Sequence, residues 1–158
     1  MIVYKTGDLF TTTKTVIGHG VNCKGAMGSG IAVAVKNLFP ENYQAYHNIC
    51  VKQMLKPGMV YPYREKGKVI LNIATQNKTG RDAHLDWVAI GMWKALGYCE
   101  DRNFDGLAIP RIGAGIGGLD WPDVHSLLQE IFEGSPLELE IWTLPEQVEE
   151  DAKNGIRY

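Results

Sequence analysis

The hydrophobic and polar positions of this chain follow two periods, which alternate along the sequence. Short runs of β-branched and aromatic residues predict strands, and apolar residues spaced three and four apart predict helices. We expect strands at residues 2–4, 15–20, 59–63, 69–75, 107–109 and 137–144. We expect helices after an N-cap at Ser29, from Pro40, over residues 83–97 and from residues 120–123. Strands that alternate with helices predict an α/β fold, in which helices cover both faces of one sheet.

The last expected strand alternates strictly between apolar and polar side chains. Trp142 falls in register with Glu138 and Glu140, so its indole is expected to face away from the main core. An aromatic side chain on that second face can stack on a ligand, or it can lie beneath a helix that covers the same face. The pattern leaves both interpretations of Trp142 open.

The length of 158 residues fits one domain. We expect this domain to span residues 1–145 and to be followed by an acidic tail, residues 146–158, that frays. No stretch approaches the ~18 consecutive apolar residues of a membrane span, and the first residues lack the pattern of a signal peptide. Three cysteines without C-x-x-C spacing predict reduced thiols, and therefore a cytoplasmic protein.

Charge and composition exclude several classes of partner. Sixteen Lys and Arg against 18 Asp and Glu give a net charge of −2, so the chain has no overall basic surface for nucleic acid. No group of His, Asp or Glu has the spacing of metal ligands, and we expect neither a metal nor a cofactor. A monomer that binds no membrane is expected.

Glycine is the exception to this ordinary composition. The chain has 18 glycines, and seven of them lie in two short loops, residues 25–30 and 113–118. Each loop follows a predicted strand and precedes a helix, which is where α/β sheets bind ligands. Backbone N–H groups in such loops form concave sites for anions, so two of them suit a diphosphate. The alternative is that the glycines only form tight turns.

Two common nucleotide-binding motifs do not fit these loops. Residues 113–118 contain G-x-G-x-x-G, but they lie near the end of the chain with no ribose-binding unit after them. Neither loop is followed by the Gly-Lys-Ser/Thr of a phosphate-binding Walker loop. The sequence therefore argues against both a dinucleotide-binding fold and an NTPase.

Several motifs together resemble the macro domain family, whose members bind ADP-ribose, and the resemblance spans nearly the whole chain. It is similar above all to the branch of ADP-ribose 1″-phosphate phosphatases and ADP-ribosyl-glutamate and ADP-ribosyl-DNA hydrolases. The resemblance implies a three-layer α/β/α fold with a mixed, mostly parallel sheet. The motifs are Gly7-Asp8-Leu9, His19 with Asn22-Cys23, Gly28-Ser29-Gly30-Ile31-Ala32, Phe39-Pro40-Glu41, residues 72–76, and residues 110–115 with 118–121.

The resemblance also implies roles for individual residues. Asp8 would accept a hydrogen bond from the adenine amino group, although it can equally cap the turn after the first strand. Asn22 and the first loop would surround the distal ribose, the second loop would clasp the diphosphate, and Trp142 would border the adenine. The expected ligand-binding residues are Asp8, Leu9, Asn22, Gly25, Met27, Gly28, Ser29, Gly30, Ile31, Thr75, Gln76, Arg111, Gly113, Ala114, Gly115, Ile116, Gly117, Gly118 and Trp142.

The chain departs from this family where the hydrolases keep catalytic residues. Protein- and DNA-directed hydrolases of the branch have a lysine just after the fourth strand, and here that place is Gln76-Asn77, followed by Lys78. The glutamate-directed enzymes also have an aspartate in the second loop, where this chain has Gly117. Both departures argue against the removal of ADP-ribose from protein or nucleic acid.

The remaining candidates favour phosphate release. His19 could carry a proton and Asn22 could orient water or the ribose, although a histidine on an apolar strand is more often a buried core residue. We therefore expect an ADP-ribose-binding domain that hydrolyses ADP-ribose 1″-phosphate to ADP-ribose and phosphate. The alternatives are a domain that binds ADP-ribose without catalysis, and a hydrolase that removes ADP-ribose from protein or nucleic acid.

Overall fold

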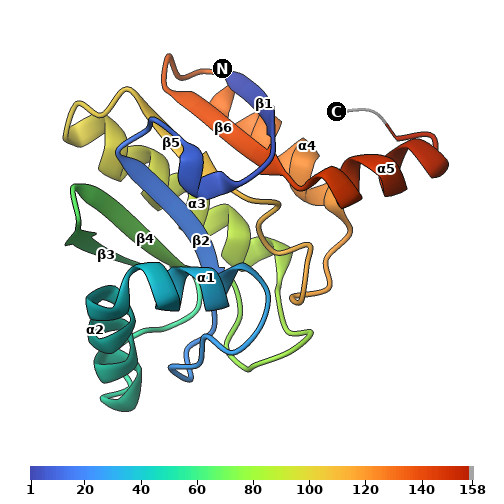
Figure 1. Ribbon diagram of the computed structural model, residues 1–158. Coiled ribbons are helices and arrows are strands. Elements are labelled where there is room, and N and C mark those ends of the chain that lie inside the picture. The colour runs from blue at the N-terminus through green and yellow to red at the C-terminus, as the bar shows by residue number, and fades with distance from the viewer. Residues whose placement is uncertain (157–158) are drawn as a thin grey trace.

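The computed structural model describes residues 1–156, and its centre is one twisted sheet (Figure 1). The strand order is β1-β6-β5-β2-β4-β3, and only β3 runs antiparallel to its neighbour. Because five neighbouring strands are parallel, their carboxyl ends meet at one edge of the sheet. The strands are β1 (Ile2–Thr6), β2 (Val16–Val21), β3 (Val60–Glu65), β4 (Lys68–Ala74), β5 (Gly106–Ile109) and β6 (Glu138–Thr143).

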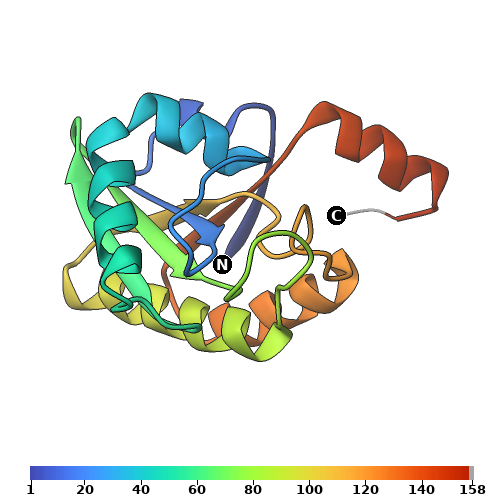
Figure 2. The same ribbon diagram turned by 90° about the horizontal axis from the view of Figure 1, so that it is seen from below.

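Helices cover both faces of this sheet, which confirms the expected three-layer α/β/α fold with a mixed, mostly parallel sheet. Helices α1 and α2 lie on one face, and α3 and α4 lie on the other (Figure 2). None of the helices within residues 1–156 is long and apolar enough to cross a membrane. The helices are α1 (Ile31–Leu38), α2 (Pro40–Val51), α3 (Leu85–Asp101), α4 (Trp121–Phe132) and α5 (Pro145–Lys153), with a short 3-10 helix at Leu9–Thr11.

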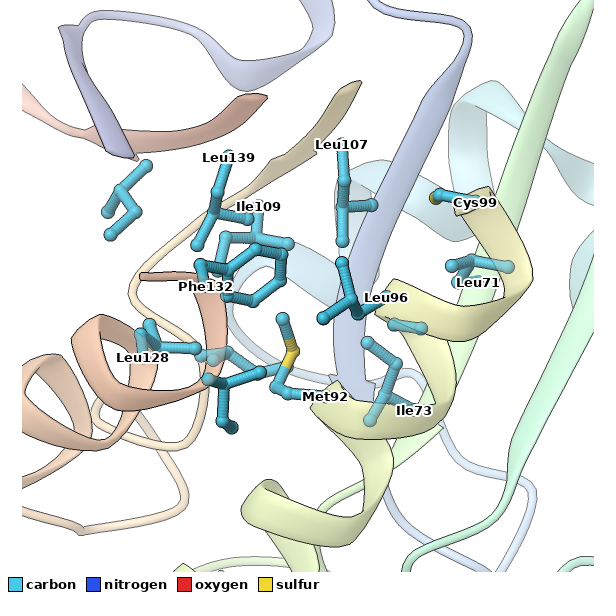
Figure 3. Close-up of a cluster of buried hydrophobic side chains, with 14 of the residues drawn as sticks. Leu71, Ile73, Met92, Leu96, Cys99, Leu107, Ile109, Leu128, Phe132 and Leu139 are labelled. Atoms are coloured by element: carbon cyan, nitrogen blue, oxygen red, sulfur yellow. The ribbon is translucent and has the colours of Figure 1, made fainter. Parts of the chain in front are cut away.

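Each face of the sheet has its own core. The larger core joins the sheet to α3 and α4, and Figure 3 shows Met92 and Leu96 of α3 against Leu107 of β5. The smaller core joins the sheet to α1 and α2. Trp142 packs against this smaller core, while its neighbour Ile141 lies in the larger one, so the strand alternation placed its indole on the correct face.

The structure shifts two expected helix starts. Gly30, not Ser29, is the N-cap residue of α1, and no side chain caps that helix. Gly30 has φ 62°, a conformation that favours glycine, so the chain turns there and Ser29 stays outside the helix. Helix α3 begins at Leu85, because Ala83 pairs with Gln76 in an isolated β-bridge and is therefore extended.

The segment after the last strand contains a helix that the sequence did not predict. Its residues form α5 up to Lys153, and Figure 1 shows this helix beyond the end of the sheet. Residues 157 and 158 of the expected tail lie outside the described residues. The division into a domain of residues 1–145 and a separate tail stays a prediction.

Candidate functional site

A cavity of about 740 Å³ lies at the carboxyl ends of the parallel strands. All five of these strands contribute to its lining, directly or through the loops that follow them. Neighbouring strands are about 4.8 Å apart, so the row of five spans roughly 19 Å. The expected ligand-binding residues that line the cavity are Asp8, Leu9, Ser29, Gly30, Ile31, Thr75, Gln76, Arg111, Gly113, Gly115, Ile116, Gly117 and Trp142.

The two glycine loops border the middle of this cavity. The first loop leads into α1, whose N-terminal N–H groups have no side-chain cap and begin at the cavity wall. The second glycine loop lies close to this start of α1. A Cβ added at Gly30 would be only 3.4 Å from Cγ1 of Ile116 in the second loop. A helix N-terminus carries partial positive charge, so this part of the cavity suits an anion.

One end of the cavity, at β1 and β6, is built from a carboxylate and an indole. Asp8 Oδ1 accepts a hydrogen bond from the Phe10 N–H at 2.9 Å and thereby caps the 3-10 helix, yet Asp8 is exposed and lines the cavity. Trp142 Nε1 donates to buried Glu140 at 2.9 Å, which orients the indole. Capping and ligand contact are therefore compatible at Asp8.

Near the other end of the cavity, at β2 and β4, lie the two positions at which the chain departs from the family. Gln76 donates from Nε2 to the carbonyls of Lys78 and Gly80, at 2.6 and 2.9 Å, so its amide holds its own loop. Lys78 is exposed and is not among the residues of the lining. A Cβ at Gly117 would lie 2.7 Å from Cβ of Ala83, so an aspartate has no room there.

Six expected ligand-binding residues lie outside the lining of the cavity, mostly because they serve the loops themselves. Met27 is 3% exposed and packs in the smaller core. Gly25 turns its carbonyl toward α2, and Asn22 closes a turn within the first loop. The six are Asn22, Gly25, Met27, Gly28, Ala114 and Gly118.

The structure places His19 away from the cavity and gives no support to its expected catalytic role. Its side chain lies on the face of the sheet that α1 and α2 cover, and it is fully buried. Its Nε2 is 2.8 Å from Oδ1 of Asn72 on the neighbouring strand β4. Burial lowers the pKa of His19, and the hydrogen bond to Asn72 raises it. Burial has the larger effect, so the pKa is about 4. His19 is therefore a neutral core residue at pH 7.

This burial predicts a pH-dependent loss of stability. The pKa of His19 is about 4 in the folded chain and 6.5 ordinarily, so below pH 6.5 the unfolded chain binds the proton more readily. The contribution of neutral His19 is complete above pH 6.5 and is lost as the pH falls toward 4, by about 3 kcal/mol in total. His19→Gln, which cannot titrate, should lose less stability over that range in urea unfolding. Parallel curves for the two proteins would contradict the assignment.

Helix α5 contributes to the site, which the sequence pattern did not predict. Leu144 and the first turn of α5, residues 145–147, line the end of the cavity next to Trp142. Pro145 at the first helical position and Glu146 in the first turn are signals of a helix start. The acidic composition of the segment had instead indicated a tail without a helix.

An ion pair attaches α5 to the second glycine loop. Arg111 donates to both carboxylate oxygens of Asp151, with 3.1 Å between Nη1 and Oδ1. The side chains are 9% and 16% exposed, so the pair is nearly buried. Arg111 therefore lines the cavity as expected, but its guanidinium also holds α5 in place.

Within residues 1–156, no group of three His, Cys, Asp or Glu side chains could hold a metal ion.

The sequence and the fold of this chain are similar to those of known proteins. The profile named Macro domain matches residues 19–128. A DNA ADP-ribosyl glycohydrolase of Thermus aquaticus is 30% identical over 148 residues, covering 90% of this chain but only 40% of the relative's length. An ADP-ribose 1″-phosphate phosphatase of Candida albicans is 31% identical over 145 residues, covering 82% of this chain and 93% of that protein. The macrodomain of Mycobacterium tuberculosis DarG superposes with TM-score 0.84 at 29% identity, over 92% and 98% of the two chains.

Proposed function

Because this chain belongs to the Macro domain family, we propose that its cavity binds ADP-ribose and that the chain hydrolyses ADP-ribose 1″-phosphate to ADP-ribose and phosphate. One observation carries the proposal. Two glycine loops and the uncapped start of α1 border one cavity that runs along the carboxyl ends of the five parallel strands, with a carboxylate and an indole at one end. This order of groups suits a ligand that has an aromatic base, a diphosphate and a second sugar in a row.

The lining suggests how each part of the ligand would be held. Asp8 can accept a hydrogen bond from the amino group of adenine, and the edge of Trp142 offers an apolar contact to the ring. The N–H groups of the glycine loops and of α1 can bind the diphosphate. The second ribose would then lie near Thr75 and Gln76, at the opposite end of the cavity.

Hydrolysis at that end would depend on position more than on acid and base groups. The oxygen of a water molecule attacks phosphorus, and the bond from phosphorus to the anomeric oxygen breaks. One proton of the water passes to that anomeric oxygen, which becomes the hydroxyl of ADP-ribose, and the water oxygen stays on the released phosphate. The ionisable residues in the lining are Asp8, Arg111 and Glu146, and none of them belongs to the β2 and β4 end. Phosphoryl transfer gains mostly from positioning and backbone donors, so we expect slow but measurable turnover.

Release of ADP-ribose from DNA is the second candidate, and the relative in Thermus aquaticus favours it. Gln76 argues against this candidate. It occupies the place of the lysine in that branch, and its amide donates hydrogen bonds to its own loop. A domain that binds ADP-ribose without turnover is the third candidate. The same cavity supports all three, so substrates must distinguish them.

Phosphate release is the decisive measurement. We expect the protein to release phosphate from ADP-ribose 1″-phosphate and to release little ADP-ribose from ADP-ribosylated DNA or glutamate. Gly115→Glu, which obstructs the cavity, should lose the release and thereby exclude a contaminating phosphatase. Binding of ADP-ribose without any release would show the non-catalytic domain instead. Rapid release of ADP-ribose from DNA would mean that another group replaces the missing lysine.

A further inference from the structure

The first half of the first glycine loop is held by a dense set of hydrogen bonds that the cavity does not explain. Asn22 Oδ1 accepts from the N–H of Lys24 at 2.9 Å and from the N–H of Ala26 at 3.3 Å, and its Nδ2 donates to the Ala26 carbonyl at 2.9 Å. The amide of Asn22 thus closes a turn in its own loop.

Helix α2 clamps this turn from outside. The hydroxyl of Tyr46 donates to the carbonyl oxygen of Asn22 at 2.6 Å and also lies 3.0 Å from Asn22 Oδ1. Tyr46 is fully buried, and burial raises the pKa of its hydroxyl, so the hydroxyl stays protonated and keeps donating. Nδ1 of His47, one residue further along α2, lies 3.0 Å from the carbonyl oxygen of Gly25.

The contact with α2 is so close that glycine is required at position 25. A Cβ there would lie 2.8 Å from Nδ1 of His47, and the φ of Gly25 is +82°. On the other side of the loop, the N–H of Cys23 donates to the carbonyl of Asn77 at 3.1 Å. Buried Met27 then anchors the chain in the smaller core. Residues 28–30 follow the held part of the loop and are exposed, immediately before the cavity wall of α1.

We propose that Asn22, Tyr46 and His47 form a clamp that positions the first glycine loop. The clamp fixes residues 22–27, so that Ser29, Gly30 and Ile31 meet the ligand with their N–H groups already oriented. A preformed loop avoids the cost of ordering it on binding. Tyr46 and His47 are positioning residues of the ADP-ribose site, and this inference rests on the proposed function.

Tyr46→Phe tests the clamp, because it removes one hydroxyl and keeps the ring that fills the core. We expect its Kd for ADP-ribose to rise about tenfold, the size of one lost hydrogen bond. The Kd for AMP should change less than about twofold, because AMP lacks the second phosphate and the distal ribose and so makes fewer contacts with residues 29–31. Tyr63→Phe, which removes a hydroxyl on β3, is the matched control and should bind both ligands as the wild type does. Calorimetry measures all four changes.

His47 supplies an independent variant. His47→Ala should weaken ADP-ribose binding, and His47→Asn should restore it, because the amide nitrogen of asparagine can occupy the place of Nδ1. A purely structural loss of packing would not be rescued by the shorter asparagine. Equal weakening of ADP-ribose and AMP, or no rescue, would overturn the proposal.

Amide hydrogen exchange separates the clamp from the proposed function. In Tyr46→Phe without ligand, the amides of residues 22–26 should exchange at least about tenfold faster than in the wild type and in Tyr63→Phe. If the wild type failed to bind ADP-ribose, the proposed function would fall and this exchange would decide the clamp alone. Unchanged exchange would refute the clamp even if ADP-ribose bound tightly.

Discussion

Gly115→Glu should abolish ADP-ribose binding and leave the fold intact. Gly115 is exposed at the cavity wall, and a Cβ added there would meet nothing within 4 Å, so the backbone tolerates a side chain. The glutamate would enter the space of the diphosphate and repel its charge. Like charges about 4 Å apart at a protein surface repel by roughly 4 kcal/mol, which weakens binding by more than about a hundredfold.

Calorimetry with ADP-ribose and a thermal melt of each protein test this prediction. Gly115→Ala is the matched control, because it adds only the Cβ that open space accommodates, and it should bind nearly as well as the wild type. Both variants should melt close to the wild-type temperature. If Gly115→Glu bound ADP-ribose normally, the second loop would be a turn that does not border the ligand.

Asp151→Ala should release α5 and weaken the site from its other end. The substitution removes the α5 partner of the Arg111 guanidinium, and breaking a nearly buried ion pair costs roughly 3–5 kcal/mol. None of the side chains of α5 is buried, so little else holds this helix against the domain. The first turn of α5 lines the cavity, and its loss should raise the Kd for both ADP-ribose and AMP.

Hydrogen exchange of α5 and calorimetry give the two readouts for Asp151→Ala. Glu149→Ala is the control, because it removes the same charge from an exposed position of the same helix. It should leave both readouts unchanged. Normal exchange of α5 in Asp151→Ala would show that contacts other than the ion pair hold the helix.

Much of the fold could be predicted because it follows from short stretches of chain. The expected strand at residues 107–109 differs from β5 by one residue, since a buried strand is an apolar run between turns. Trp142 was placed on the correct face because alternate side chains of a strand point to opposite faces. Both glycine loops border the cavity, because loops that follow parallel strands meet at one edge of the sheet.

Individual site residues were harder to predict than the loops that carry them. Met27 lies in a glycine-rich loop, yet its apolar side chain turns into the core, which removes it from the cavity. Asn22 is at the end of β2, yet its amide bonds to its own loop. A glycine-rich loop after a strand indicates where a ligand can lie. Whether each side chain of the loop contacts the ligand or the protein depends on the residues that surround it in the fold.

The sequence by itself determined the order of the elements, the two glycine loops and the face of each strand residue, because these depend on neighbours along the chain. Only the tertiary structure decided that His19 meets Asn72, 53 residues away, and that Arg111 holds Asp151, 40 residues away. The first contact exists because β2 lies beside β4 in the sheet, and the second because α5 follows β6, which lies beside β5. Periodicity specifies which way a side chain points, whereas its partner depends on which segments the folded chain brings together.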